Sequence, residues 1–182
     1  MPTHPLFLLL ALGVAAAAAW TDWRTGTIPN RLTFGALLLA PVAHFAAAIL
    51  LGHSHVALEA AGMSIFGAAT CGIVPFLMYR SGGMAGGDVK LLAALGAICL
   101  PTLGIETQVF GLFFATFYAA GVLAYQGKLL STAKNAAALA LNPFRKKENK
   151  RTVPKELMIQ MRFGPSVLAG VVAAAAMQVW GQ

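Results

Sequence analysis

The fold is decided by one stretch of the chain, Leu32-Thr-Phe-Gly-Ala-Leu-Leu-Leu-Ala-Pro-Val-Ala-His-Phe-Ala-Ala-Ala-Ile-Leu-Leu51, which contains no charged residue. A helix needs about 20 predominantly apolar residues to cross a bilayer, and this stretch has that length. The whole chain of 182 residues is similar, with 58% hydrophobic and only 10% charged residues. A soluble domain carries about 25% charged residues. We therefore expect an integral membrane protein.

Other apolar segments of the chain are also of a length that suits membrane helices. Membrane-spanning β-strands would be shorter and would alternate in polarity, so the predicted fold class is all-α, a single bundle over residues 1–182. The first segment is expected to be retained, because a signal peptide begins with basic residues and Met1–Trp20 has none. The six predicted transmembrane helices are Pro5–Trp20, Leu32–Leu51, Val56–Tyr79, Val89–Ile105, Thr107–Tyr125 and Phe163–Trp180.

Basic residues alternate between the loops that join these segments. Loops 21–31 and 80–90 each contain Lys or Arg, whereas loop 52–55 and the turn predicted around Glu106 contain neither. Cytoplasmic loops of membrane proteins carry the excess of Lys and Arg. The first, third and fifth loops are therefore expected in the cytoplasm, with both termini outside.

The fifth loop, residues 126–162, carries the whole net charge of +7. Nine of the 13 Lys and Arg residues lie there, against two glutamates. Basic segments beside membrane helices usually set topology and meet anionic head groups, so we expect membrane lipid, and not nucleic acid, as the partner. Within this cytoplasmic loop, Lys128–Leu141 is expected to form a short interfacial helix that Asn142-Pro143 ends.

The chain has two aspartates, Asp22 at the end of the first predicted span and Asp88 at the start of the fourth. The predicted topology puts both on the cytoplasmic side. Two carboxylates at close range share a proton, so that one acts as base and the other as acid on a single water. That is the chemistry of an aspartic peptidase. The structural alternatives are a helix cap at Asp88 and an ion pair between Asp22 and Arg24.

The histidines and cysteines of the chain do not indicate a further catalytic or metal site. His53, His55 and Glu59 do not complete a ligand set, so no metal and no cofactor are expected. His44, in the middle of the second span, is expected to pack and hydrogen-bond. The two cysteines, Cys71 and Cys99, are interpreted as small packing residues.

Three stretches resemble the type IV prepilin peptidases, a family of membrane aspartic peptidases with a Gly-x-Gly-Asp signature. The first aspartate motif is similar to Asp22-Trp-Arg-Thr-Gly-Thr-Ile-Pro-Asn30, and the second to Gly83-Met-Ala-Gly-Gly-Asp-Val-Lys90. The final-helix motif resembles Phe163-Gly-Pro-Ser-Val-Leu-Ala-Gly170. The glycines of the second motif are shifted by one residue, because Ala85 stands where the signature has its first glycine.

This resemblance implies that Asp22 and Asp88 are catalytic. It implies substrate-binding or loop-shaping roles for the residues around them: Ile28, Pro29, Asn30, Gly83, Ala85, Gly86, Gly87 and Lys90. The implied substrate is a prepilin or pseudopilin with a basic leader, cleaved on the cytoplasmic side of the bacterial inner membrane. Because the chain lacks paired Cys-x-x-Cys motifs, it resembles the short form, similar to the peptidases of Flp/Tad-type pili.

Alternatives to a peptidase stay open at this point. A small transporter or proton-coupled channel would also carry carboxylates, but near the middle of the bilayer. A catalytically inert relative that assists pilus assembly is suggested by Ala85. For Lys90, the alternative to a role beside Asp88 is that its ammonium group extends to the membrane interface.

Overall fold

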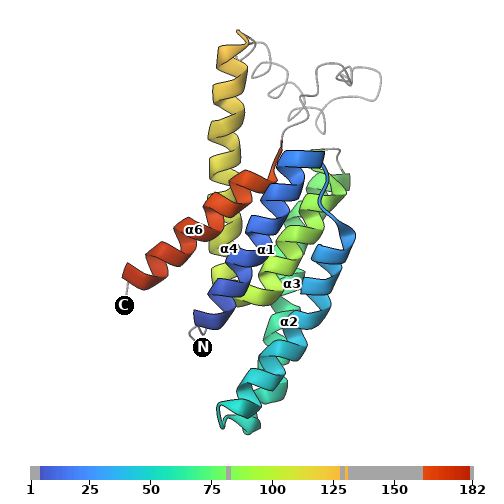
Figure 1. Cartoon of the computed structure of the whole chain (residues 1–182), viewed down its shortest axis with the longest axis vertical. Helices are drawn as coiled ribbons and strands as arrows, with labels where there is room; N and C mark the ends of the chain where they lie inside the picture. The colour runs from blue at the N-terminus through green and yellow to red at the C-terminus, as the bar shows by residue number, and fades with distance from the viewer. Residues whose placement is uncertain (1–4, 81–82, 128–129, 131–161, 181–182) are drawn as a thin grey trace, which may run out of the picture. The chain divides into compact units, whose positions relative to one another are not determined.

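The computed structural model describes residues 5–80, 83–127, 130 and 162–180. Every regular element in these ranges is a helix, which confirms the all-α fold class for the described part of the chain (Figure 1). The elements are α1 (Pro5–Thr25), α2 (Asn30–Leu50), the short 3-10 helix η1 (Ser54–Val56), α3 (Ala57–Arg80), α4 (Gly86–Tyr125) and α6 (Gly164–Trp180). Most of the basic loop, with the interfacial helix predicted for Lys128–Leu141, lies outside the described residues.

The helices follow the predicted apolar segments. Four stretches are long and apolar enough to cross a membrane, and α6 is a shorter apolar helix. These four are α1, α2, Ser54–Arg80 and α4. The number of crossings and the side of the termini stay predictions. Among the described residues, those up to Ala115 and from Arg162 onward form one compact unit, and those from Thr116 on in α4 belong to a second.

The predicted boundary between the fourth and fifth spans is wrong. The turn predicted around Glu106, between the fourth and fifth spans, is helical, and the break in α4 lies at Leu100 instead. Leu100 has φ 64° and ψ 170°, and a positive φ is costly for a residue with a Cβ. The chain reverses here: a Cβ on Gly104 would lie only 2.9 Å from the Cα of Gly96. The segments 86–99 and 101–115 therefore run in opposite directions (Figure 1).

Side chains from two other helices bind the carbonyl groups that this break exposes. Pro101 has no N–H to donate to the oxygen of Ala97, and the Ser64 hydroxyl donates to that oxygen at 2.7 Å. Nε2 of His44 hydrogen-bonds to the oxygen of Ile98 at 3.0 Å. Unpaired backbone groups are costly inside a bilayer, so both contacts stabilise the break. The expectation that His44 packs and hydrogen-bonds is thereby confirmed.

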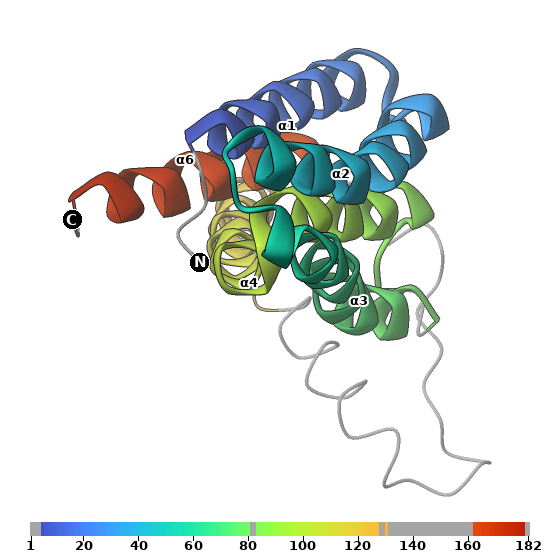
Figure 2. The ribbon, with the colours of Figure 1, turned by 90° about the horizontal axis from the view of Figure 1, so that it is seen from below.

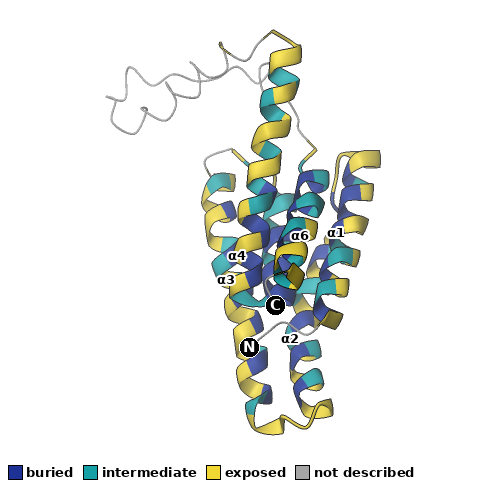
Figure 3. Ribbon diagram, turned by 90° about the vertical axis from the view of Figure 1, so that its left-hand side faces the viewer, coloured by how far each residue is buried: buried dark blue, intermediate teal, exposed yellow. Residues whose placement is uncertain are grey.

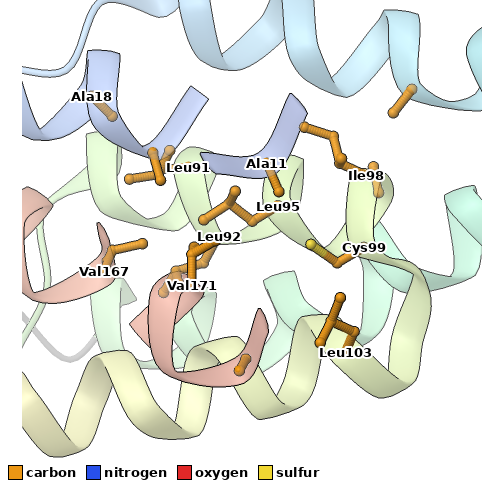
Figure 4. Close-up of a cluster of buried hydrophobic side chains, with 14 of the residues drawn as sticks. Ala11, Ala18, Leu91, Leu92, Leu95, Ile98, Cys99, Leu103, Val167 and Val171 are labelled. Carbon is orange, nitrogen blue, oxygen red and sulfur yellow. The ribbon is translucent and has the colours of Figure 1, made fainter. Parts of the chain in front are cut away.

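The core is centred on the first segment of α4. This segment is buried on nearly all sides between Leu91 and Cys99, as a helix surrounded by other helices must be. It lies between α1 and α2 on one side and α3 on the other (Figure 2). Figure 4 shows its apolar side chains against small residues of α1 and valines of α6: Ala11, Ala18, Val167 and Val171.

Glycines allow this close packing, and apolar side chains cover the outside. A Cβ on Gly67 of α3 would collide with the carbonyl oxygen of Gly96 in α4, so the two backbones are in direct contact. Both cysteines are buried and free, as expected of packing residues. Large apolar side chains are exposed, for example Leu50 at 84% and Leu58 at 80%. Figure 3 shows exposed residues along the outer sides of the helices. We expect these outer sides to contact lipid.

Candidate active site

The first aspartate, Asp22, lies in the last turn of α1 and is only 6% exposed. Helix α1 ends because Gly26 adopts φ +69°, and the N–H of Gly26 bonds to the backbone oxygen of Asp22 at 2.9 Å. The carboxylate of Asp22 accepts a hydrogen bond of 2.8 Å from the backbone N–H of Gly164. The Arg24 guanidinium lies over the ring of Trp20, so the ion pair considered from the sequence is not the observed arrangement.

The second aspartate, Asp88, lies half-buried in the first turn of α4. Its backbone N–H bonds to the oxygen of Ala85 at 3.1 Å, and the backbone N–H of Ala85 bonds to its carboxylate. This reciprocal pair resembles a capping box, so Asp88 does cap its own helix. The charge of Asp22 also acts on Asp88, which places the two carboxylates within electrostatic range of each other.

The loop that follows Asp22 packs on the start of α4. Ile28 is 9% exposed, and a Cβ on Gly87 would lie 3.5 Å from its Cβ, an ordinary contact distance. Nζ of Lys90 donates a hydrogen bond to Oδ1 of Asn30 at 3.0 Å and lies 4.8 Å from the ring centroid of Phe34. The two aspartate motifs are thus in direct contact. Lys90 joins them, which the interpretation as an interfacial lysine did not predict.

The remaining residues of the two motifs shape the chain on either side of these contacts. Pro29 is extended, with ψ 131°, and α2 begins at the next residue. Gly83 and Ala85 lie exposed in the turn before α4, and Gly86 and Gly87 are its first two residues. Among the described glycines, positive φ occurs elsewhere, at Gly26, Gly52 and Gly127. The glycines beside Asp88 therefore do not supply unusual torsions, and a Cβ on Gly86 or Gly87 would make ordinary van der Waals contacts.

Sequence reasoning did not assign Gly164 to the site, although it quoted the surrounding motif. A Cβ at this position would lie 3.0 Å from the Cβ of Asp22 and 3.0 Å from the Cα of Ala19. The dipeptide Gly164-Pro165 could have indicated that a helix begins here, because proline is favoured in the first turn of a helix. Only the packing of α6 against α1 shows which side chain the glycine meets.

Residues that could hold a metal are not grouped in the described ranges, since no three His, Cys, Asp or Glu side chains come together there. The ring centroids of His53 and His55 lie 6.3 Å apart. What the described residues offer for chemistry is therefore the pair of aspartates, supported by backbone N–H groups.

The described part of the chain is therefore a bundle of apolar helices with an aspartate at the end of α1 and another at the start of α4. Residues 8–124 match the model of the type IV leader peptidase family, and this is more than half of the chain. The chain belongs to that family. Neither the curated proteins nor the solved structures contain a match. The matched residues include both aspartates but end before α6 and Gly164.

Proposed function

We propose that this chain is a membrane aspartic endopeptidase, which removes the leader of prepilin or pseudopilin proteins at the cytoplasmic face of the bacterial inner membrane. Membership of the type IV leader peptidase family supports a leader peptidase. The aspartic mechanism is supported by the positions of Asp22 and Asp88 at the ends of two helices whose motifs contact each other at Ile28 and Gly87. The Lys90–Asn30 hydrogen bond supports it, because it holds the two motifs together.

The proposed reaction uses one water and one shared proton. The ionised carboxylate takes a proton from the water as the water oxygen attacks the scissile carbonyl carbon, and the protonated carboxylic acid donates to the carbonyl oxygen. The resulting diol collapses when the carboxyl group that took the water proton gives it to the leaving nitrogen, the other carboxylate takes a proton from a diol hydroxyl, and the peptide C–N bond breaks. Both carboxylates are needed, since neither can supply a base and an acid at the same moment.

The positions of the carboxylates favour this reaction over transport. Asp22 lies in the last turn of α1 and Asp88 in the first turn of α4, so both are at helix ends. A transporter would bind its ion near the middle of the bilayer. Among the described non-glycine residues, Leu100 alone has a positive φ, so Ala85 occupies its position without that kind of backbone strain. The replacement of glycine by Ala85 therefore gives no support to an inert relative.

The test is co-expression of the chain with a prepilin that has a basic leader, with leader removal followed by gel shift and mass spectrometry. We expect cleavage with the wild type and none with Asp22→Asn/Asp88→Asn. The matched control is Glu106→Gln, which neutralises an exposed carboxylate of α4. Normal cleavage by the double variant, or cleavage at the opposite membrane face, would contradict the proposal.

A further inference from the structure

We infer that the start of α6 is part of the active site, where the backbone N–H of Gly164 is a positioning group for the carboxylate of Asp22. This inference rests on the proposed peptidase function. It adds to the site a segment that lies outside the family match of residues 8–124.

The contact itself is short, buried and remote in sequence. The Gly164 nitrogen lies 2.8 Å from Oδ2 of Asp22, and 142 residues separate the two along the chain. Both residues are buried. A buried carboxylate without a partner is strongly unfavourable, and a hydrogen bond to it is strengthened by the low local dielectric. The position of Asp22 therefore depends on how α6 packs against α1.

The first turn of α6 provides this N–H for a specific reason. The first N–H groups of a helix have no carbonyl partner within it, and they point outward at the positive end of the helix dipole. Pro165 has no N–H, so Gly164 is the residue at the very start of α6 that can donate. The Val167 N–H already bonds to the oxygen of Phe163 at 3.1 Å.

The close packing of α6 against α1 favours glycine at this position. A Cβ on Gly164 would lie 3.1 Å from the same Oδ2 that accepts the hydrogen bond, besides its contacts with the Cα of Ala19 and the Cβ of Asp22. With a larger residue at this position, the neighbouring atoms of Ala19 and Asp22 would have to shift by a few tenths of an ångström. The absence of a side chain thus keeps the N–H within hydrogen-bonding distance.

The two aspartates are held in different ways, and this difference gives the N–H its role. Asp88 receives its backbone hydrogen bond from Ala85, in the turn that precedes its own helix. Asp22 receives its hydrogen bond from another helix. Because an N–H can only donate, it fixes one oxygen of the Asp22 carboxylate as its acceptor. The other oxygen then has a defined direction for water and substrate.

The test removes the N–H without adding a side chain. Cell-free synthesis into lipid nanodiscs replaces Gly164 by glycolic acid, which converts its amide into an ester. The matched control is the same replacement at Gly170, another buried glycine of α6, whose close contacts are with Gly111 and Thr107. We expect the Gly164 ester to lower kcat for prepilin cleavage by about 10- to 100-fold, as loss of a hydrogen bond to a charged group does, with KM nearly unchanged.

A second readout does not depend on activity. The chain has only two aspartates, so ¹³C-carboxyl-labelled aspartate in an Asp88→Asn background reports on Asp22 alone in the infrared spectrum. We expect the labelled carboxylate band to shift in the Gly164 ester and to keep its position in the Gly170 ester. An unshifted band, or equal losses of kcat in both esters, would overturn the inference. A wild-type chain that cleaves no prepilin would instead contradict the proposed function, while the infrared comparison would still decide the role of Gly164.

Discussion

Two regions of the molecule bury polar groups among apolar helices, and they pair these groups in opposite ways. At the break in α4 around Leu100, the side chains of Ser64 and His44 bond to backbone carbonyl oxygens. At the site, backbone N–H groups of Gly164 and Ala85 bond to carboxylates. In the first region, side chains bind carbonyl oxygens that the break in the helix leaves unpaired. In the second region, backbone N–H groups hold two acidic side chains near each other.

This difference separates a structural polar cluster from a reactive one. Neutral hydrogen-bonded pairs at the break satisfy the backbone and leave no net charge in the bundle. Two neighbouring carboxylates repel each other when both are ionised, a cost that folding alone gives no reason to accept. His44 is the titratable residue in the middle of α2, where function would be the default assumption, yet it belongs to the structural cluster.

The largest expected effect would come from neutralising one acid at a time. Asp22→Asn and Asp88→Asn should each lower the rate of leader cleavage by about 100- to 10,000-fold, because either the base or the acid is lost. His44→Gln, the matched change at the break, should stay within a few-fold of wild type. Initial rates at equal membrane levels provide the measurement, and comparable losses in all three variants would erase the distinction between the two regions.

The largest expected effect on stability lies near the break. Gly67→Ala should lower the free energy of unfolding by about 3 kcal/mol, since the new methyl group would collide with the carbonyl of Gly96. Gly62→Ala in the same helix should be harmless, because a Cβ there meets nothing within 4 Å. Unfolding in mixed detergent micelles measures both. Equal stabilities would mean that α3 and α4 are not packed through these glycines.

A smaller effect on stability is expected from the hydrogen bond that stabilises the break. Ser64→Ala leaves the Ala97 oxygen without its 2.7 Å donor and should cost about 1 kcal/mol in unfolding free energy. The comparison variant is Thr70→Ala, because the Thr70 hydroxyl bonds within its own helix, to the carbonyls of Phe66 and Gly67 and to the Cys71 side chain. The same micelle assay reports both variants. If Thr70→Ala were the more damaging, the role assigned to Ser64 would be incorrect.

The smallest expected effect concerns the contact between the two motifs. Lys90→Met and Asn30→Ala each remove the 3.0 Å hydrogen bond, and the double variant should be hardly worse than either single variant. We expect a coupling of about 1 kcal/mol in kcat/KM, a factor of about 5, because this pair is exposed. The double-mutant cycle supplies its own control. Strictly additive effects would show that Lys90 acts without Asn30.

The positions of the helices, and of the two aspartates at helix ends, could be predicted from the amino acids alone. Long apolar segments permit little other than helices in a bilayer, because each helix satisfies its own backbone hydrogen bonds. The error at Glu106 has a local cause. Pro101 indicated an interruption of the helix, but leucine is not a residue type from which the positive φ of Leu100 could be predicted. The reversal is stabilised by Ser64 and His44, which lie far away in sequence.

The residues that surround the aspartates could not be predicted, because they come from helices that are far apart in the chain. The Lys90–Asn30 hydrogen bond spans 60 residues and the Gly164–Asp22 hydrogen bond spans 142, and no periodicity in the chain connects such positions. A hydrophobic pattern can predict that a helix is buried, but it does not predict which other helix it packs against. The pairing of α6 with α1 comes from close packing at Gly164 and Ala19. Because Gly164 has no side chain, its backbone N–H can approach the carboxylate of Asp22.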